Sequence, residues 1–286
     1  MNKRFNSNKL KMKKIAIRTG LLIVVLSMVT LSSCSNDDTQ TVTTLDNLIM
    51  SDEFSTDGAP SSAMWNFDIG NGAAQGIPGW GNNELQYYTD RSENVVIEEG
   101  MLKITARQES FEGSGYTSAR IQTKDKFEKK HGRFEARIQL PWSQGLWPAF
   151  WMLGANSDEV TWPACGEIDI MENRGQEPTL INGTLHGPGY SAGESITKAF
   201  ELEGDRFDTG FHIFGIEWGQ GYINFYVDDV LYNQLTPSDV TGEWIFDDQP
   251  FYIIMNVAVG GNYVGPPNEN SVFPQTMLVD YVRIYE

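Results

Sequence analysis

The chain has 286 residues, with 38 Asp and Glu against 21 Lys and Arg, so its formal net charge is −17. Such an acidic surface repels nucleic acids and anionic polymers, which argues against them as partners, but it admits a neutral polysaccharide. Aromatic residues make up 12% of the chain and there are 28 glycines, a combination typical of short strands, turns and sugar-binding surfaces.

The first 33 residues have the pattern of an export signal. Seven Lys and Arg residues precede an apolar run of eleven residues, Leu21–Leu31, which is too short to span a bilayer and is typical of a secretory signal. The run leads into L-S-S-C, which resembles the bacterial lipobox, in which the cysteine becomes the lipidated first residue. We therefore predict that residues 1–33 are a lipoprotein signal peptide and that Cys34 anchors an exported protein in the outer membrane or at the cell surface of a bacterium. An ordinary signal peptide with an incidental cysteine is the alternative.

The remaining chain divides into a short tether and one domain. Residues 34–47 are largely polar and are predicted to form a flexible tether. Residues 48–286 show no internal repeat, no second linker and no helical periodicity, so we predict one all-β domain. Segments that alternate apolar and polar residues recur between turn residues and predict an antiparallel β-sandwich. These segments are Asn94–Glu99, Met101–Gln108, Gly132–Leu140, Phe211–Trp218, Tyr222–Asp228, Phe251–Val259 and Met277–Tyr285.

Two tryptophans, Trp147 and Trp151, are candidates for binding a sugar. They are four positions apart, so on a strand they share one face. A flat indole stacks on the C–H faces of a pyranose ring and offers an N–H to its hydroxyls. Core packing is the alternative, and we expect Phe150 and Met152 to take that role on the opposite face.

Three carboxylates lie close together in the run G-E-I-D-I-M-E-N-R-G, between Gly166 and Gly175. The two glycines predict one short strand between turns. Alternation along a strand puts Glu167 and Asp169 on the same face but turns Glu172 to the other face, because its separation from them is odd. A β-bulge at one of the two residues before Glu172 would bring all three acids to one face.

Three acids on one strand face are unusual because like charges placed side by side cost stability. Their proximity separates their pKa values, so that one carboxyl stays protonated while another stays ionised. An acid and an anion that flank one bond are the groups that hydrolyse a glycoside, and in a retaining mechanism they lie roughly 5–5.5 Å apart. The alternative is an edge strand with a solvated acidic face.

The motif G-E-I-D-I-M-E-N resembles the signature of glycoside hydrolase family 16, in the form with an extra residue that is typical of laminarinase-like endo-β-1,3-glucanases. The resemblance covers about Asp52 to Tyr285. It implies a jelly roll with a concave substrate cleft. It also implies that Glu167 is the nucleophile, that Asp169 assists it, and that Glu172 is the acid/base.

The same resemblance implies further site residues. Asn82, in G-W-G-N-N-E, would contact a glucose unit, and Arg120, in S-A-R-I, would face the cleft. His186, in T-L-H-G, would lie near Asp169 and the acid/base and orient a carboxyl by hydrogen bonding. The alternatives are a turn asparagine, a surface salt bridge and a structural histidine.

A structural Ca²⁺ is also implied by the resemblance, with Glu53, Gly100 and Asp280 at the matching positions. Ligation by oxygen alone is what calcium prefers. No cofactor is expected for catalysis.

The resemblance implies a monomeric retaining endo-hydrolase of β-1,3-glucan of the laminarin type, and it leaves mixed-linkage β-1,3-1,4-glucan open as a further substrate. Three alternatives stay open. The first is a galactan hydrolase of the same family that acts on agar or carrageenan, and the second is a surface glycan-binding lipoprotein without turnover. The third is a transglycosylase on the same scaffold.

Overall fold

A computed structural model describes residues 44–286. The predicted signal peptide, the predicted lipid anchor at Cys34 and residues 34–43 of the predicted tether lie outside the described residues. Within the described part, no helix is long and apolar enough to cross a membrane.

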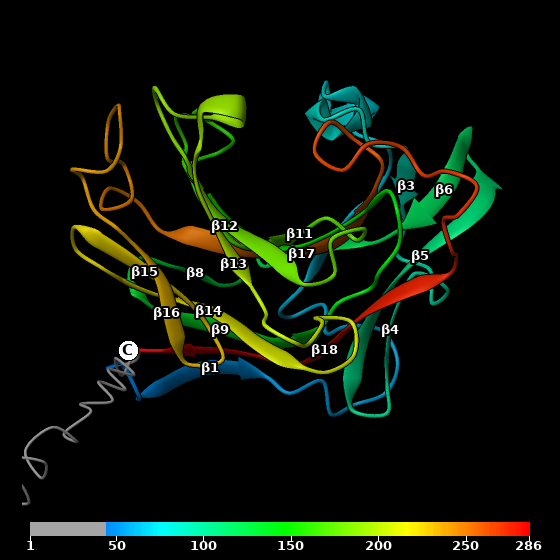
Figure 1. Cartoon of the computed structure of the whole chain (residues 1–286), viewed down its shortest axis with the longest axis horizontal. Helices are drawn as coiled ribbons and strands as arrows, with labels where there is room; N and C mark the ends of the chain where they lie inside the picture. Colours follow the sequence, from blue (N-terminus) through cyan, green and yellow to red (C-terminus); the bar gives the residue numbers. More distant parts are fainter. Residues whose placement is uncertain (1–43) are drawn as a thin grey trace, which may run out of the picture. The chain divides into compact units, whose positions relative to one another are not determined.

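Two large β-sheets face each other and contain all the strands of the described chain (Figure 1). One has ten strands, in the order β16-β15-β14-β9-β18-β5-β6-β3, with β1 beside β18 and β4 beside β5. The long strand β18 pairs with β5 through its first half and with β1 through its second half. The strands are β1 (Leu48–Asp52), β3 (Gln86–Tyr88), β4 (Val95–Glu98), β5 (Met101–Phe111), β6 (Ser114–Ser118), β9 (Gly132–Gln139), β14 (His212–Gly219), β15 (Tyr222–Val227), β16 (Val230–Leu235) and β18 (Gln275–Tyr285).

The second sheet has eight strands, in the order β13-β12-β11-β10-β17-β7-β2, with β8 beside β17. All of its pairings are antiparallel; in the first sheet, β3 and β6 run parallel. The strands are β2 (Asn66–Asp68), β7 (Arg120–Gln122), β8 (Glu128–Lys129), β10 (Leu146–Gly154), β11 (Glu167–Asn173), β12 (Leu180–His186), β13 (Ile196–Glu201) and β17 (Phe251–Val259). Three short 3₁₀ turns complete the described elements: η1 (Ala73–Gln75), η2 (Pro78–Gly81) and η3 (Ala192–Glu194).

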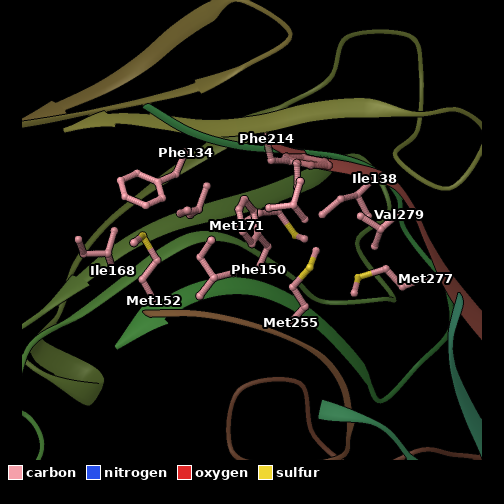
Figure 2. Close-up of a cluster of buried hydrophobic side chains, with 14 of the residues drawn as sticks. Phe134, Ile138, Phe150, Met152, Ile168, Met171, Phe214, Met255, Met277 and Val279 are labelled. Carbon is pink, nitrogen blue, oxygen red and sulfur yellow. The ribbon is translucent and has the colours of Figure 1, made fainter. Parts of the chain in front are cut away.

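The core lies between the two sheets and is built from the inward-facing positions of their strands. Figure 2 shows part of it: side chains of one sheet meet side chains of the other, without a polar atom among those drawn. The labelled residues are all fully buried, and burial of aliphatic and aromatic side chains is the main force that holds the sheets together. They are Phe134, Ile138, Phe150, Met152, Ile168, Met171, Phe214, Met255, Met277 and Val279.

The alternating segments of the sequence did form strands. β17 has the predicted bounds, and each of the other six predicted segments lies on a strand whose ends differ from the prediction by one to three residues. The all-β antiparallel sandwich is therefore confirmed. Phe150 and Met152 pack in the core, as predicted from their alternation with the two tryptophans of β10.

The first described residues are attached to the ten-stranded sheet. The Thr44 backbone N–H and hydroxyl both donate to the carboxylate of Glu217 on β14, each at 2.6 Å. Asn47 exchanges two backbone hydrogen bonds with Glu286. The attached part of the chain thus begins before Leu48, the predicted start of the domain. Glu217 alternates with Trp218, which packs against the opposite sheet, so Thr44 lies on the outer face of its own sheet.

Candidate active site

A β-bulge in β11 brings the three predicted acids to one face. Between Asp169 and Glu172, β11 has one residue more than the facing part of β12, and the pairing with β10 shifts at the same place. The two residues in between are both buried in the core, as is Ile168. The carboxylates of Glu167, Asp169 and Glu172 therefore lie on the face of β11 that points away from the core, as predicted.

Glu172 is held between the two neighbouring strands. The indole N–H of Trp147, on β10, donates to its carboxylate at 3.0 Å, and the hydroxyl of Thr184, on β12, approaches the other oxygen at 3.5 Å. Burial, followed by the negative charge of Asp169, raises the pKa of Glu172 to about 8. Glu172 is therefore protonated at neutral pH, as a general acid must be.

Glu167 lies at the start of β11 and keeps contact with solvent, since its side chain is 18% exposed. The indole N–H of Trp162 donates to its carboxylate at 3.0 Å, and the Nε2 atom of His186 lies 3.6 Å from its other oxygen. Burial and the charge of Asp169 raise the pKa of Glu167 well above its ordinary value.

Asp169 is the most enclosed of the three acids, with 4% of its surface exposed. Its Oδ2 atom lies 3.1 Å from His186 Nε2, but the two are not aligned as a hydrogen bond, and Oδ2 has no other partner among the described residues. Burial raises the pKa of Asp169 to about 8.

A nucleophile must be ionised, so the raised pKa of Glu167 has to be weighed against the pKa of its neighbour. The two carboxyls lie close together and cannot easily both carry charge. N–H donors stabilise an anion, and Glu167 has the Trp162 indole and some solvent, whereas Asp169 has no aligned N–H donor and pairs with the Glu167 carboxyl instead. We therefore place the shared proton on Asp169, which leaves Glu167 as the anion.

The other predicted binding residues form a separate network along the same sheet. Arg120, on β7, forms a salt bridge with Asp68 at 2.6 Å and stacks on the ring of Trp80 at 3.8 Å. This salt bridge is largely buried, unlike the surface pair considered from the sequence, because the Arg120 side chain is only 13% exposed. The indole N–H of Trp151 donates to Asn256 at 2.8 Å.

Asn82 lies in the loop beside this network. Its side chain is exposed, and its amide donates to Glu84 at 3.4 Å. Glu84 also accepts a hydrogen bond from the side-chain amide of Gln86 at 2.6 Å. Burial raises the pKa of Glu84. Of the five predicted binding residues, Trp147 and His186 make polar contacts with the acids. Trp151 lies across from Asp169 in the pairing of β10 with β11, but its indole N–H bonds to Asn256 instead. Arg120 and Asn82 have their polar contacts elsewhere, with Asp68 and Glu84.

Sequence reasoning did not predict the contacts that three further residues make at the site. Trp162 lies five positions before Glu167, and this short spacing was an available signal. Thr184 follows from the pairing of β12 with β11, which the sequence does not specify. Tyr263 packs against Trp147 with ring centroids 5.0 Å apart, and its hydroxyl accepts a hydrogen bond from Asn182 at 2.5 Å. Because Tyr263 is far from β11 in the sequence, no sequence pattern indicated that it would pack near the acids.

The two carboxylates proposed as calcium ligands form salt bridges with arginine side chains. Both carboxylate oxygens of Glu53 accept bonds from Arg283 at 2.9 Å, and Asp280 forms a salt bridge with Arg137 at 2.7 Å. Gly100 lies in the turn between β4 and β5 with a φ of 73°. As arranged, both carboxylates are neutralised by arginine and do not offer a free set of oxygen ligands. Calcium binding stays a prediction.

Comparison with known proteins gives a consistent result. A family profile described as "Glycosyl hydrolases family 16" matches residues 82–283, a range that includes β11. The chain is 39% identical to a beta-glucanase of Rhodothermus marinus over 96% of both chains. The laminarinase catalytic domain of Thermotoga maritima is 51% identical with a TM-score of 0.80, over 84% of this chain and 98% of that chain. An endo-beta-1,3-glucanase of Pyrococcus furiosus is 49% identical with a TM-score of 0.79, over 84% of this chain and 94% of that chain.

Proposed function

This chain belongs to family 16 of the glycosyl hydrolases, and we propose that it is a retaining endo-hydrolase of β-1,3-glucan. The laminarinase and endo-β-1,3-glucanase relatives support this substrate over other polysaccharides. Mixed-linkage β-1,3-1,4-glucan is a candidate second substrate. The strongly acidic composition argues against sulfated galactans such as carrageenan, because like charges repel.

Each acid has one role in the proposed reaction. Glu172, with its raised pKa, donates a proton to the glycosidic oxygen while the Glu167 carboxylate attacks the anomeric carbon. A covalent glycosyl-enzyme forms and the leaving sugar departs. Glu172, now ionised, takes a proton from water, which attacks the anomeric carbon and releases Glu167. Asp169 carries the proton that keeps the charge of the pair on Glu167.

The bulge of β11 is the observation that carries this proposal. Without the extra residue, Glu172 would point into the core between the sheets and no proton donor would face Glu167. A glycan-binding protein without turnover needs no such arrangement, because three adjacent buried acids with no Lys or Arg salt bridge among the described residues cost stability and gain nothing for binding.

The decisive experiment measures reducing-sugar release from laminarin. Wild type should release sugar, Glu167→Ser should release essentially none, and Glu201→Gln, an exposed acid on β13 of the same sheet, should match wild type. Proton NMR of early products should show retention of the anomeric configuration. If wild type binds laminarin but releases nothing, the chain is the non-catalytic glycan-binding protein instead.

A panel of laminarin, lichenan, agarose and carrageenan then identifies the preferred linkage. Products longer than the donor chain would indicate transglycosylation. The same assay at several protein concentrations, with light scattering for mass, tests the expected monomer.

We also propose that Cys34 carries a lipid anchor, from the L-S-S-C motif that follows the apolar run. Cells that express the full chain can be labelled with a palmitate analogue. Label should enter wild type and be lost in Cys34→Ala. Cys165→Ala is the matched control, because Cys165 is the other cysteine of the chain and is buried. Label that persists in Cys34→Ala would rule the anchor out.

A further inference from the structure

We propose that the backbone N–H of Ala192 fixes the tautomer of His186, so that the neutral imidazole presents its proton from Nε2 to the Asp169–Glu167 pair. His186 is then a positioning residue for the two acids and not a metal ligand. The proposal rests on the proposed function for the roles of those acids, but the tautomer itself can be measured without any assay of activity.

The tautomer follows from one hydrogen bond. The Ala192 N–H donates to Nδ1 of His186 at 3.1 Å. A ring nitrogen that accepts a hydrogen bond carries no proton, so the single proton of the neutral imidazole must be on Nε2. The fixed tautomer thus aims an N–H, and not a lone pair, at the acids.

Nε2 faces a buried oxygen that lacks a donor. Asp169 Oδ2 lies 3.1 Å away and has no hydrogen-bond partner among the described residues, although it is fully enclosed. Buried oxygens are rarely left without a donor, because the lost hydration is costly. A small rotation of the imidazole would align Nε2–H with either Asp169 or Glu167, whose Oε1 is 3.6 Å away. The Nε2–H of His186 can therefore bond to whichever of the two carboxyls, Asp169 or Glu167, carries the negative charge.

The backbone around Ala192 is adapted to this contact. Ala192 has a φ of 48°, in the left-handed region that costs a residue with a Cβ roughly 1 kcal/mol or more. The turn is closed by hydrogen bonds from Glu194 to Ser191 at 3.0 Å and from Ser195 to Ala192 at 3.2 Å. Ala192 is exposed, so core packing does not explain its conformation. This conformation directs the Ala192 N–H at the Nδ1 atom of His186.

The same three side chains have the composition of a divalent cation site. One ligand atom each from Glu167, Asp169 and His186 lie within 4.8 Å of one another. A cation would need the lone pair of Nε2, whereas the Ala192 hydrogen bond leaves a proton there. Cation binding would therefore require the loss of that bond. The geometry favours a proton donor over a metal ligand.

Nitrogen-detected NMR of the imidazole rings tests the tautomer directly. The chain has three histidines, so Gln substitution of each assigns the spectrum. We expect the Nε2–H form for His186. His212 supplies an internal contrast, because its Nδ1 lies 2.6 Å from a carboxylate oxygen of Asp228 and should carry the proton. An Nδ1–H form for His186 would overturn the proposal whether or not the enzyme cuts β-glucan.

A pair of variants in the exposed turn tests the role of the N–H. Ala192→Pro removes the donor and cannot adopt a φ of 48°, so the tautomer should become mixed and kcat should fall by about tenfold with little change in KM. Gly193→Ala is the matched control, since its new Cβ would enter open space, and it should keep wild-type values. Unchanged His212 signals would show that both variants are folded. An unchanged His186 tautomer in Ala192→Pro would contradict the proposal.

Zinc titration of the wild-type protein tests the metal alternative. With one equivalent of Zn²⁺, the His186 nitrogen signals should stay in place. A stoichiometric shift of both His186 nitrogens, absent in His186→Gln, would show that the three side chains bind a cation and would overturn the proposal.

Discussion

Two polar clusters built on buried acids, one on each sheet, have opposite chemistry. Glu135, on β9, is 2% exposed and pairs with Arg133, and it accepts bonds from the hydroxyls of three tyrosines at 3.0 to 3.4 Å, namely Tyr226, Tyr281 and Tyr285. The acids of β11 have indole and hydroxyl donors and a histidine, but no Lys or Arg salt bridge among the described residues. Burial alone therefore does not mark an active site, whereas burial without a countercharge does.

The largest expected effect comes from an isosteric change in the β11 cluster. Glu172→Gln removes the proton donor and keeps the shape, so kcat on laminarin should fall by about 10³-fold. Thermal stability at neutral pH should not decrease, because Glu172 is already uncharged there and glutamine keeps its shape. Activity within tenfold of wild type would show that another group protonates the leaving oxygen.

The matching change in the other cluster should have the opposite outcome. Glu135→Gln leaves Arg133, whose side chain is only 15% exposed, as a charge without its partner, so the free energy of unfolding should drop by about 3 kcal/mol. The value of kcat should stay the same at a temperature where the protein is folded. Urea denaturation and laminarin assays on the same sample measure both quantities, and a loss of kcat without a loss of stability would contradict the comparison.

A smaller effect is expected when one N–H donor of Glu167 is removed. Trp162→Phe keeps an aromatic ring but loses the bond to the nucleophile, so kcat should fall by about tenfold. Trp142→Phe is the matched control, because Trp142 is 44% exposed, close to the 41% of Trp162, and its ring lies against Arg206 instead of an acid. Equal activity of the two variants would mean that the indole bond has no part in catalysis.

The smallest effect concerns pH. The pKa values of Asp169 and Glu172 rise from 3.8 and 4.5 to about 8 in the folded protein, so the folded state binds more protons than the unfolded state between these values. Stability should therefore fall as pH rises from 5 to 8. Glu172→Gln should lose less over this range, by on the order of 1 kcal/mol for each pH unit. Parallel pH profiles of the two proteins, from urea denaturation, would disprove the raised pKa of Glu172.

The spacing of residues within β11 was enough to predict its face and its bulge. Glu167, Asp169 and Glu172 could be joined on one face only by an extra residue, and the structure has it between Asp169 and Glu172. The shared face of Trp147 and Trp151 followed from the same alternation. These predictions succeeded because they depend on local backbone geometry alone.

Contacts between strands could not be predicted in this way. That Trp147 donates to Glu172, whereas Trp151 donates to Asn256, depends on the register of β10 against both of its neighbours. The burial of the Arg120–Asp68 pair likewise depends on the pairing of β7 with β2, more than fifty residues apart in sequence. Sequence periodicity fixes which face a residue occupies but not which side chain it meets there.

The attachment of Thr44 to Glu217 has a practical consequence. Glu217 lies on the outer face of the ten-stranded sheet, and the acids of β11 lie on the outer face of the other sheet, with the core between them. A handle fused ahead of Thr44 therefore enters on the side of the sandwich opposite the acids. Immobilising the enzyme on a bead through that end should leave the catalytic groups open to a long polymer, and a pull on the handle would load the Thr44–Glu217 contact and then β1 before it reached β11.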